Sequence, residues 1–351
     1  MKCLVLYEEL ATYFLNCLNF LAEHHDCKIL VIMKKVNPIA PFDFNDVHPN
    51  IRLEEREKLN EQQLKKEITN FSPDFTYISG WIYKPYLKVV KALSLKNVII
   101  GFDNQYNGSW KQQLGAIYFR LKYKSFIKAA FVPGEKQVQF AKKLGFKSTL
   151  VSKNVYCCDY ELYNHYAEST KQLKQKEFPK RFLFVGRYVH EKGIQHLWDA
   201  FTELDKELNS DWELWCIGKG PLTPLNHPKI KHLGFIQPKD FLPVIESTGV
   251  FVLPSFFEPW GVVLHEFAAA GYPIISTTAV GATEVFLKDS LNGFCIVPNS
   301  KEALKRALKN IVSLNDKKLM EMSSASRELA REITPGIWTQ SLLKLVNEPS
   351  S

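Results

Sequence analysis

The chain has 351 residues, 46% of them hydrophobic, and carries 45 Lys and Arg against 37 Asp and Glu, a formal net charge of +8. This length predicts about two domains, each with a substantial core. No apolar run is long enough to span a membrane, and the first residues run into a strand pattern without the features of a signal peptide, so we expect a cytoplasmic protein. The seven cysteines show no Cys-x-x-Cys spacing, which favours reduced thiols over a zinc site.

The first half alternates apolar strands with helical patterns. The predicted strands are Cys3–Tyr7, Lys28–Met33, Phe75–Ile78, Val98–Gly101, Ala129–Val132 and Thr149–Val151. Strands separated by helices of this length are typical of a parallel sheet covered on both faces. Residues 1–153 are therefore predicted to form one doubly wound, Rossmann-like α/β domain.

The positive charge gathers in one segment of this half, Trp81–Lys153, which holds 14 basic residues and only Asp103 and Glu135 as acids. Its centre, Ile117–Lys128, interleaves aromatic and basic side chains on a predicted helix. Such a face suits an ordinary solvated surface, an anionic membrane or acceptor, or a nucleic acid. The first two interpretations are favoured, and no nucleic-acid partner is expected.

Residues 154–180 are polar, rich in Lys and Gln and without a strand pattern, so we predict a linker there. Residues 181–332 are predicted to form a second doubly wound domain, and residues 333–351 a C-terminal helix that packs back on the first domain. The strands predicted in the second domain are Arg181–Val185, Glu213–Ile217, Ile230–Leu233, Val250–Leu253, Pro273–Ser276 and Gly293–Val297.

Two carboxylates, Glu258 and Glu266, follow the fourth of these strands and are the most informative pair in the chain. A turn over Pro254–Pro259 and a helix over Trp260–Ala270 are predicted, which places Glu258 in the crevice where open α/β sheets bind ligands. The free amides and positive dipole end of that helix suit a phosphate, and carboxylates accept hydrogen bonds from sugar hydroxyls. The alternative is that Glu258 only complements the helix dipole and that Glu266 is a solvated helix residue.

Two further strand-to-glycine turns belong to the same predicted edge. Gly186 and Arg187 follow the first strand, with Lys192 close behind, and two cations at such an edge can clamp a diphosphate. Gly218 opens a turn after the second strand, where backbone can approach a ligand. Together, these turns predict a nucleotide diphosphate site with carboxylates beside it.

The ordered motifs resemble the donor domain of GT-B glycosyltransferases, most closely family 4, the retaining, metal-independent group 1 glycosyl transferases. That resemblance covers Phe182 to about Val312 and implies two Rossmann-like domains facing a cleft. It is carried by Gly186–Gly193, Ile217–Pro221, Gly234–Ile236, Pro254–Pro273, Gly281, Glu284, Asn292 and Gly293.

The resemblance also implies roles for single residues. Glu266 would accept hydrogen bonds from the ribose, and Glu258 from the donor sugar. Arg187 and Lys192 would neutralise the diphosphate. Backbone amides around Gly261 and Val262 would assist these cations, and Phe235 and Ile236 would lie against the base. No cofactor or metal is expected, although Asp43 and Asp46 are close in sequence, and a UDP-sugar is favoured over a GDP-sugar.

The first domain departs from the family pattern. Tyr7–Leu10 occupies a turn where many relatives carry glycines, and Glu8 or Glu9 could contact the acceptor there. Asp103 stands near the position of a histidine that many relatives carry beside the donor sugar. We therefore include Asp103 with Glu258, Arg187 and Lys192 as a candidate catalytic residue, against the alternative of a turn or capping role.

These observations predict a retaining hexosyltransferase that uses a nucleotide-diphosphate sugar. The basic first domain favours a carbohydrate or lipid-linked glycan acceptor at the cytoplasmic face of the membrane, as in bacterial surface polysaccharide or lipopolysaccharide synthesis. The alternatives are a sugar-nucleotide epimerase on the same fold, a non-catalytic nucleotide or anion binder, and a glycoside hydrolase, which would not need the phosphate-binding cations.

Overall fold

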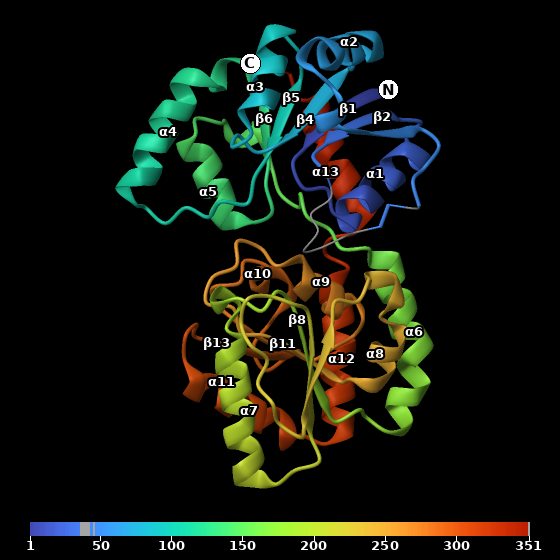
Figure 1. Ribbon diagram of the computed structural model, residues 1–351, viewed down its shortest axis with the longest axis vertical. Helices are drawn as coiled ribbons and strands as arrows, with labels where there is room; N and C mark the ends of the chain where they lie inside the picture. Colours follow the sequence, from blue (N-terminus) through green and yellow to red (C-terminus); the bar gives the residue numbers. More distant parts are fainter. Residues whose placement is uncertain (36–42, 45, 350–351) are drawn as a thin grey trace. The chain divides into compact units, whose positions relative to one another are not determined.

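The computed structural model describes residues 1–35, 43–44 and 46–349, and it divides into two compact units (Figure 1). Unit 1 comprises Met1–Cys157 together with the C-terminal residues from Ile333, and unit 2 comprises Cys158–Glu332. Asn45, inside the Asp43–Asp46 segment noted above, lies outside the described residues. None of the described helices is long and apolar enough to cross a membrane.

Unit 1 is built on a seven-stranded parallel sheet in the order β3-β2-β1-β4-β5-β6-β7. Its central strands are continuous apolar runs, and Cys3–Leu6 and Ile29–Ile32 are buried on both sides, as a sheet covered on both faces requires. The strands are β1 (Lys2–Tyr7), β2 (Lys28–Met33), β3 (Ile51–Glu55), β4 (Phe75–Ser79), β5 (Val98–Gly101), β6 (Ala129–Phe131) and β7 (Val151–Ser152).

Helices flank this sheet, and the last helix of the chain, α13, is one of them. It packs against α1, where the Trp338 ring meets the edge of Phe14 at a centroid distance of 5.5 Å. The helices are α1 (Thr12–His24), α2 (Glu61–Phe71), α3 (Lys84–Ala92), α4 (Trp110–Lys122), α5 (Glu135–Lys143) and α13 (Pro335–Asn347), with short 3-10 turns η1 (Arg56–Lys58), η2 (Lys124–Phe126) and η3 (Ser148–Leu150).

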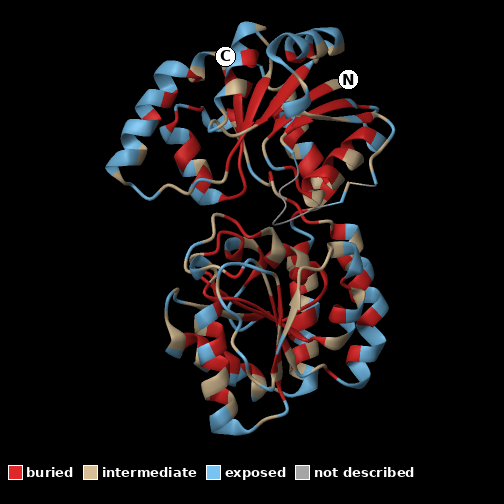
Figure 2. Cartoon of the chain, viewed as in Figure 1, coloured by how far each residue is buried: buried red, intermediate tan, exposed pale blue. Residues whose placement is uncertain are grey.

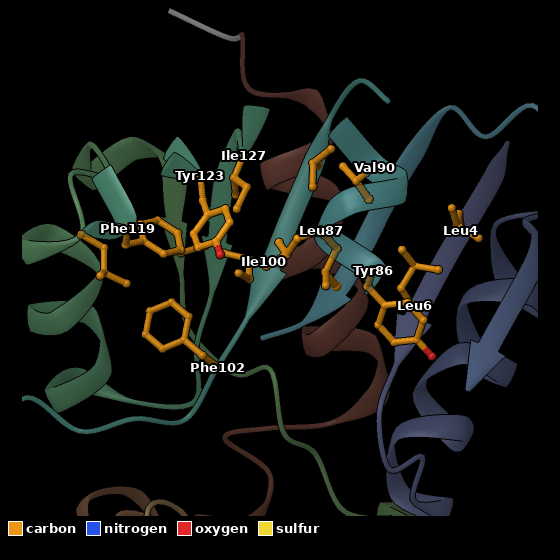
Figure 3. Close-up of a cluster of buried hydrophobic side chains, with 14 of the residues drawn as sticks. Leu4, Leu6, Tyr86, Leu87, Val90, Ile100, Phe102, Phe119, Tyr123 and Ile127 are labelled. Atoms are coloured by element: carbon orange, nitrogen blue, oxygen red, sulfur yellow. The ribbon is translucent and has the colours of Figure 1, made fainter. Parts of the chain in front are cut away.

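The core of unit 1 gathers where these helices cover the sheet. Side chains of β1 and β5, such as Leu6 and Ile100, lie in one cluster with Leu87 of α3 and with Phe119 (Figure 3). The cluster is rich in aromatic rings, and its members are almost completely buried. In both units, the strands are buried and the outer faces of the helices are exposed (Figure 2).

Unit 2 repeats the architecture with a six-stranded parallel sheet in the order β10-β9-β8-β11-β12-β13. The strands are β8 (Arg181–Val185), β9 (Glu213–Ile217), β10 (Ile230–Gly234), β11 (Val250–Leu253), β12 (Ile274–Thr277) and β13 (Gly293–Ile296). The helices are α6 (Tyr160–Lys176), α7 (Ile194–Leu208), α8 (Leu242–Ser247), α9 (Val262–Ala269), α10 (Thr283–Phe286), α11 (Lys301–Val312) and α12 (Asp316–Ala330), with η4 (His190–Lys192) and η5 (Pro238–Asp240).

Several local expectations differ from the structure. The strand expected over Thr149–Val151 is mostly the 3-10 turn η3, and β7 covers only Val151–Ser152. The segment 154–180, expected as a linker, contains α6, whose tyrosine-rich face packs against α8 and α9. Strand β3 was not expected, because its charged sequence looks helical and only Ile51 among its residues is buried. The basic helix expected over Ile117–Lys128 is α4, which begins at Trp110 and ends at Lys122.

Candidate functional site

In the sheet of unit 2, the strand order reverses between β8 and β11. After β8 the chain continues to strands on one side of this pair, and after β11 it continues to strands on the other side. In open α/β sheets, ligands bind outside the carboxyl ends of the strands at such a switch point. Arg187 and Lys192 follow β8, and Glu258 follows β11. The fold therefore brings these predicted residues to one place.

Lys192 and Glu258 meet across the switch point. The Lys192 ammonium donates to Oε2 of Glu258, and the two side chains are only 17% and 16% exposed. The loops that carry them are joined a second time, because the Phe256 amide donates to the Glu191 carbonyl at 2.8 Å. The Glu258 amide donates to the Ala279 carbonyl, and the Glu258 carbonyl accepts from the Gly281 amide, so the loop after β12 fixes the backbone of Glu258.

Two glycines allow this close approach. Gly193, at the start of α7, has φ +67°, and a Cβ there would lie 2.2 Å from the Pro254 carbonyl oxygen. Gly261, at the start of α9, has φ +93°, and a Cβ there would lie 3.1 Å from Cγ of Glu258. A side chain at either position would strain the backbone, and at Gly193 it would also push the β8 and β11 loops apart. Glu258 consequently lies against the N-terminus of α9, whose first amides have no partners within the helix.

Arg187 stands apart from this ion pair. Its side chain is exposed, and within the described part of the chain it makes no ion pair. Its guanidinium is therefore a fixed charge beside the switch point with its hydrogen-bonding groups turned to solvent.

The residues predicted to surround the base come from the β9 and β10 loops. The Gly218 amide donates to the Gly234 carbonyl at 2.7 Å, which joins the ends of β9 and β10. Phe235 and Ile236 follow directly and are half-buried. The Gly186 amide donates to the Ile217 carbonyl at 3.0 Å, so the β8, β9 and β10 loops form one continuous edge.

Glu266 lies on α9, five residues after Gly261, and its carboxylate interacts with the hydroxyl of Tyr163 on α6. Burial raises the pKa of Glu266 to about 7, while the Tyr163 hydroxyl acts in the opposite direction and the negative charge of Asp159 adds to the rise. The carboxyl group thus changes charge near neutral pH. Its neighbour His265 is fully buried and bridges the Cys158 amide and the Ala330 carbonyl, which is a structural role.

Asp103 belongs to unit 1, whereas the other predicted site residues belong to unit 2. It is half-buried, and Oδ2 accepts a hydrogen bond from the Tyr156 hydroxyl at 3.4 Å. Burial raises the pKa of Tyr156 well above its usual range, and the charge of Asp103 adds to that rise. Asp103 also adds to the raised pKa of Tyr7 and of Tyr77, so it lies among a group of buried tyrosines.

Glu8 lies at the switch point of unit 1, between β1 and β4. Lys34 donates to Oε2 and the Tyr83 amide to Oε1, each at 3.1 Å, while the Glu8 amide donates to Oγ of Ser79 at 2.9 Å. Both carboxylate oxygens therefore already bind groups of unit 1. Glu9 is exposed.

Sequence reasoning missed two features of these sites. Tyr163 was assigned to a linker, although its spacing from Tyr160 and Tyr166 and the Asp159 cap at the start of α6 are helix signals. The tyrosines near Asp103 come from segments far apart in the chain, and no local motif connects them. No group of three or more metal-ligating side chains gathers anywhere among the described residues.

Comparison with known proteins identifies the region that holds most of this site. Residues 166–329 match the family model described as glycosyl transferases group 1. These residues lie within unit 2, so unit 2 is similar to the domain that this family model describes. An uncharacterized glycosyltransferase, MJ1607, of Methanocaldococcus jannaschii is 28% identical to this chain over 144 residues, which are 38% of this chain and 36% of that protein.

A second relative of the group 1 domain is the lipopolysaccharide core biosynthesis glycosyltransferase LpsE of Rhizobium meliloti, 30% identical over 138 residues, which are 37% of this chain and 39% of that protein. The chain thus spans less than half the length of these curated relatives.

Solved structures extend the likeness to the whole chain. Anabaena Alr3699/HepE, in complex with UDP and glucose, superposes with a TM-score of 0.71 over 98% of this chain and 99% of that one, at 14% identity. WaaG, a glycosyltransferase involved in lipopolysaccharide biosynthesis, superposes with a TM-score of 0.68 over 99% and 100%, at 13% identity. The prediction of a GT-B fold with two Rossmann-like domains is confirmed.

Proposed function

We propose that this chain is a retaining hexosyltransferase that moves a sugar from a nucleotide-diphosphate sugar to a carbohydrate or lipid-linked glycan. The observation that carries the proposal is the Lys192–Glu258 ion pair at the β8/β11 switch point, with exposed Arg187 beside it and the N-terminus of α9 against it. Cations and a helix N-terminus suit a diphosphate, and a carboxylate suits sugar hydroxyls.

Each group has a task in the proposed transfer. As the glycosidic bond breaks, negative charge develops on the departing diphosphate, and Lys192, Arg187 and the amides at Gly261 and Val262 stabilise it. Glu258 accepts a hydrogen bond from the donor sugar, and its ion pair with Lys192 orients it. The acceptor hydroxyl attacks from the face of the leaving phosphate, which takes its proton, so no enzyme nucleophile is needed.

In this proposal, the nucleoside binds along the edge that the loops after β8, β9 and β10 form. Ionised Glu266 accepts hydrogen bonds from the ribose, and Phe235 and Ile236 lie against the base. We propose uridine as that base, and the crystallisation of the structurally similar HepE with UDP-glucose supports this choice. We further propose that Asp103, with the tyrosines near it in unit 1, contacts the acceptor or the transferred sugar.

Helix α4 of unit 1 supports an acceptor at a membrane. Trp110, Leu114, Ile117 and Leu121 are 66%, 56%, 49% and 83% exposed, and their spacing places them along one side of the helix. Basic side chains lie beside this apolar stripe, namely Lys111, Arg120 and Lys122. An apolar stripe bordered by cations suits the interface of an anionic bilayer, where each nearby cation contributes about 1 kcal/mol. We therefore propose a cytoplasmic protein held at the inner face of the cell membrane, acting in surface polysaccharide or lipopolysaccharide synthesis.

Product analysis tests the transfer. The protein is incubated with UDP- and GDP-sugars and a lipid-linked glycan extract, and the products are resolved by mass spectrometry and NMR. The proposal expects a glycan extended by one sugar, with the donor's anomeric configuration retained. An inverted linkage would contradict the retaining mechanism, and an isomerised nucleotide sugar without transfer would establish the epimerase alternative.

Vesicle sedimentation tests the membrane contact. The wild type should bind vesicles that contain anionic lipid and be released as salt is raised, because surface charges are screened. Leu114→Glu with Leu121→Glu should abolish this binding, whereas Leu208→Glu, at an exposed position of unit 2, should not. Equal binding of the α4 variant and the wild type would refute this surface.

A further inference from the structure

Lys174 of unit 2 occupies a position where a buried apolar side chain is expected. The buried face of α6 follows a helical spacing through Tyr163, Tyr166, Ala167 and Thr170 to Lys174. Lys174 is only 4% exposed. Lysine is almost never buried to this degree unless it is paired.

The ammonium of Lys174 lies over the ring of Tyr272, 4.1 Å from its centroid, and has no hydrogen-bond partner in the described part of the chain. Burial lowers the pKa of Lys174 to about 7. Nearby, Nε of Arg327 on α12 is also buried without a described partner, while another nitrogen of that guanidinium donates to Asn164 and to Glu168. The ammonium of Lys174 and Nε of Arg327 are thus two buried donors whose hydrogen-bonding capacity the described residues do not use.

Both side chains line a cavity of about 260 Å³ between α6, α12 and the residues that follow α9. The charged groups that face it are four cations and one carboxylate: Lys171, Lys174, Lys317, Arg327 and Glu321. Ala270 and Gly271 close it at the C-terminal end of α9. The proposed donor phosphate site is at the opposite, N-terminal end of that helix, so the cavity is a separate site.

We propose that this cavity binds a small phosphate monoester, with Arg327 and Lys174 as its principal contacts. Lys174 is a long, flexible side chain, and a change of rotamer moves its ammonium from the Tyr272 ring to the ligand. A dianion would complement the excess of positive charge, and the cavity is large enough for a phosphate with a few attached atoms.

The site has a direct structural connection to the nucleotide region. Helix α6 carries both Lys174 and Tyr163, and the Tyr163 hydroxyl interacts with Glu266. An occupant that shifts α6 would therefore move a partner of the carboxylate proposed to hold the ribose. The phosphate site itself does not depend on the proposed transferase activity, since its residues are distinct.

Calorimetry with inorganic phosphate tests the site. Titrations are run at pH 8.5 in two buffers of different ionisation enthalpy, so that proton uptake is measured together with affinity. The wild type should bind phosphate and take up a proton, because the dianion favours the charged form of Lys174, which is mostly neutral at that pH. Lys174→Met removes the ammonium but keeps an unbranched, flexible side chain of similar length, and this variant should bind phosphate at least tenfold more weakly and without proton uptake.

Two controls separate this site from other phosphate contacts. Lys176→Met removes an exposed lysine of α6 that does not line the cavity, and it should leave phosphate binding unchanged. Arg187→Ala should also retain binding with proton uptake, since it alters only the switch-point edge. Absence of phosphate binding by the wild type, or unchanged affinity and proton uptake in Lys174→Met, would overturn the proposal.

Discussion

The two units reverse their strand order in the same way, at β1/β4 in unit 1 and at β8/β11 in unit 2. Each has a glutamate in a loop that follows a switch-point strand, Glu8 after β1 and Glu258 after β11. In unit 1, both carboxylate oxygens of Glu8 accept hydrogen bonds from Lys34 and from the Tyr83 amide. In unit 2, Glu258 pairs with Lys192 and lies against the N-terminus of α9, and Arg187 in the loop after β8 is exposed.

The difference lies in what surrounds each carboxylate. Around Glu8, the charge of Lys34 is neutralised, and its ammonium lies 4.3 Å from the centroid of the Tyr83 ring. Around Glu258, Lys192 forms the ion pair, and the exposed Arg187 follows the same strand as Lys192 and adds a further positive charge to that loop. The switch point of unit 1 thus holds Glu8 in a structural junction, whereas the switch point of unit 2 is the one that we propose binds the donor.

Loss of the Glu258 carboxylate should have the largest effect. Glu258→Gln keeps the shape of the side chain but removes the charge that pairs with Lys192 and that we propose accepts a hydrogen bond from the donor sugar. We expect turnover to fall by about 100-fold or more, on the scale seen when one stabilising group is removed from an active site. Steady-state kinetics with the identified donor, together with circular dichroism to check folding, measure this effect, and near wild-type turnover would refute the role of Glu258.

Removal of Arg187 should weaken nucleotide binding by about tenfold, because one charge-assisted contact to phosphate is lost. Stability should be unchanged, since the side chain is exposed. The matched control is Lys206→Ala, which removes an exposed cation from the end of α7. Equal affinities of the two variants for UDP in calorimetry would show that Arg187 is only a solvated charge.

Glu8→Gln tests whether Glu8 has a structural role in unit 1. This change should lower the free energy of unfolding of unit 1 by about 1–2 kcal/mol, because the partly buried Lys34 loses its ion-pair partner. Nucleotide affinity should not change. Chemical denaturation and UDP titration on the same preparation measure both quantities. Weakened UDP binding with unchanged stability would contradict the structural role of Glu8 and would point to a binding role instead.

The smallest expected effect is a pH dependence of nucleotide affinity. The pKa of Glu266 is raised to about 7, and the ribose favours the ionised carboxylate, so affinity for UDP should rise a few-fold as pH increases through about 7. Glu266→Gln should remove this component, which separates it from titration of the ligand's own phosphate. A pH profile unchanged by the substitution would contradict the ribose contact.

The same group has the opposite effect on the free protein. Because the folded pKa of Glu266 lies above its ordinary value of 4.5, the folded state retains a proton that the unfolded chain releases. Its contribution to stability is therefore fully present below pH 4.5 and is lost as pH rises through about 7. Denaturant unfolding of wild type and Glu266→Gln across this range should show the difference.

Much of the fold was predictable because the parallel strands are short apolar runs. Lys28–Met33, Val98–Gly101 and Val250–Leu253 were placed correctly at both ends. The edge strand β3 was not, since a strand with one buried residue lacks that signal. Helix α6 was taken for a linker because its exposed face is polar, and the tyrosines on its buried face are spread through that polar sequence.

The switch-point site of unit 2 was predictable in part because each loop carries its own short motif. Glycines, cations and a carboxylate lie within a few residues of the strand ends, and the parallel sheet brings those ends together. The interaction between Tyr163 and Glu266 and the cavity at Lys174 depend on how helices pack, and no sequence spacing describes that. The engagement of Glu8 by Lys34 likewise becomes visible only once β1 and β2 are paired.

The most direct test of the central claim, that the β8/β11 edge binds a nucleotide diphosphate, is thermal stability with UDP, GDP, ADP and dTDP on wild type and Glu266→Ala. At about 100 times its Kd, a ligand adds roughly 2.7 kcal/mol to the stability of the state that binds it, which gives a clear shift. The account predicts a shift with UDP that is weakened in the variant. No shift with any of the four nucleotides would contradict it.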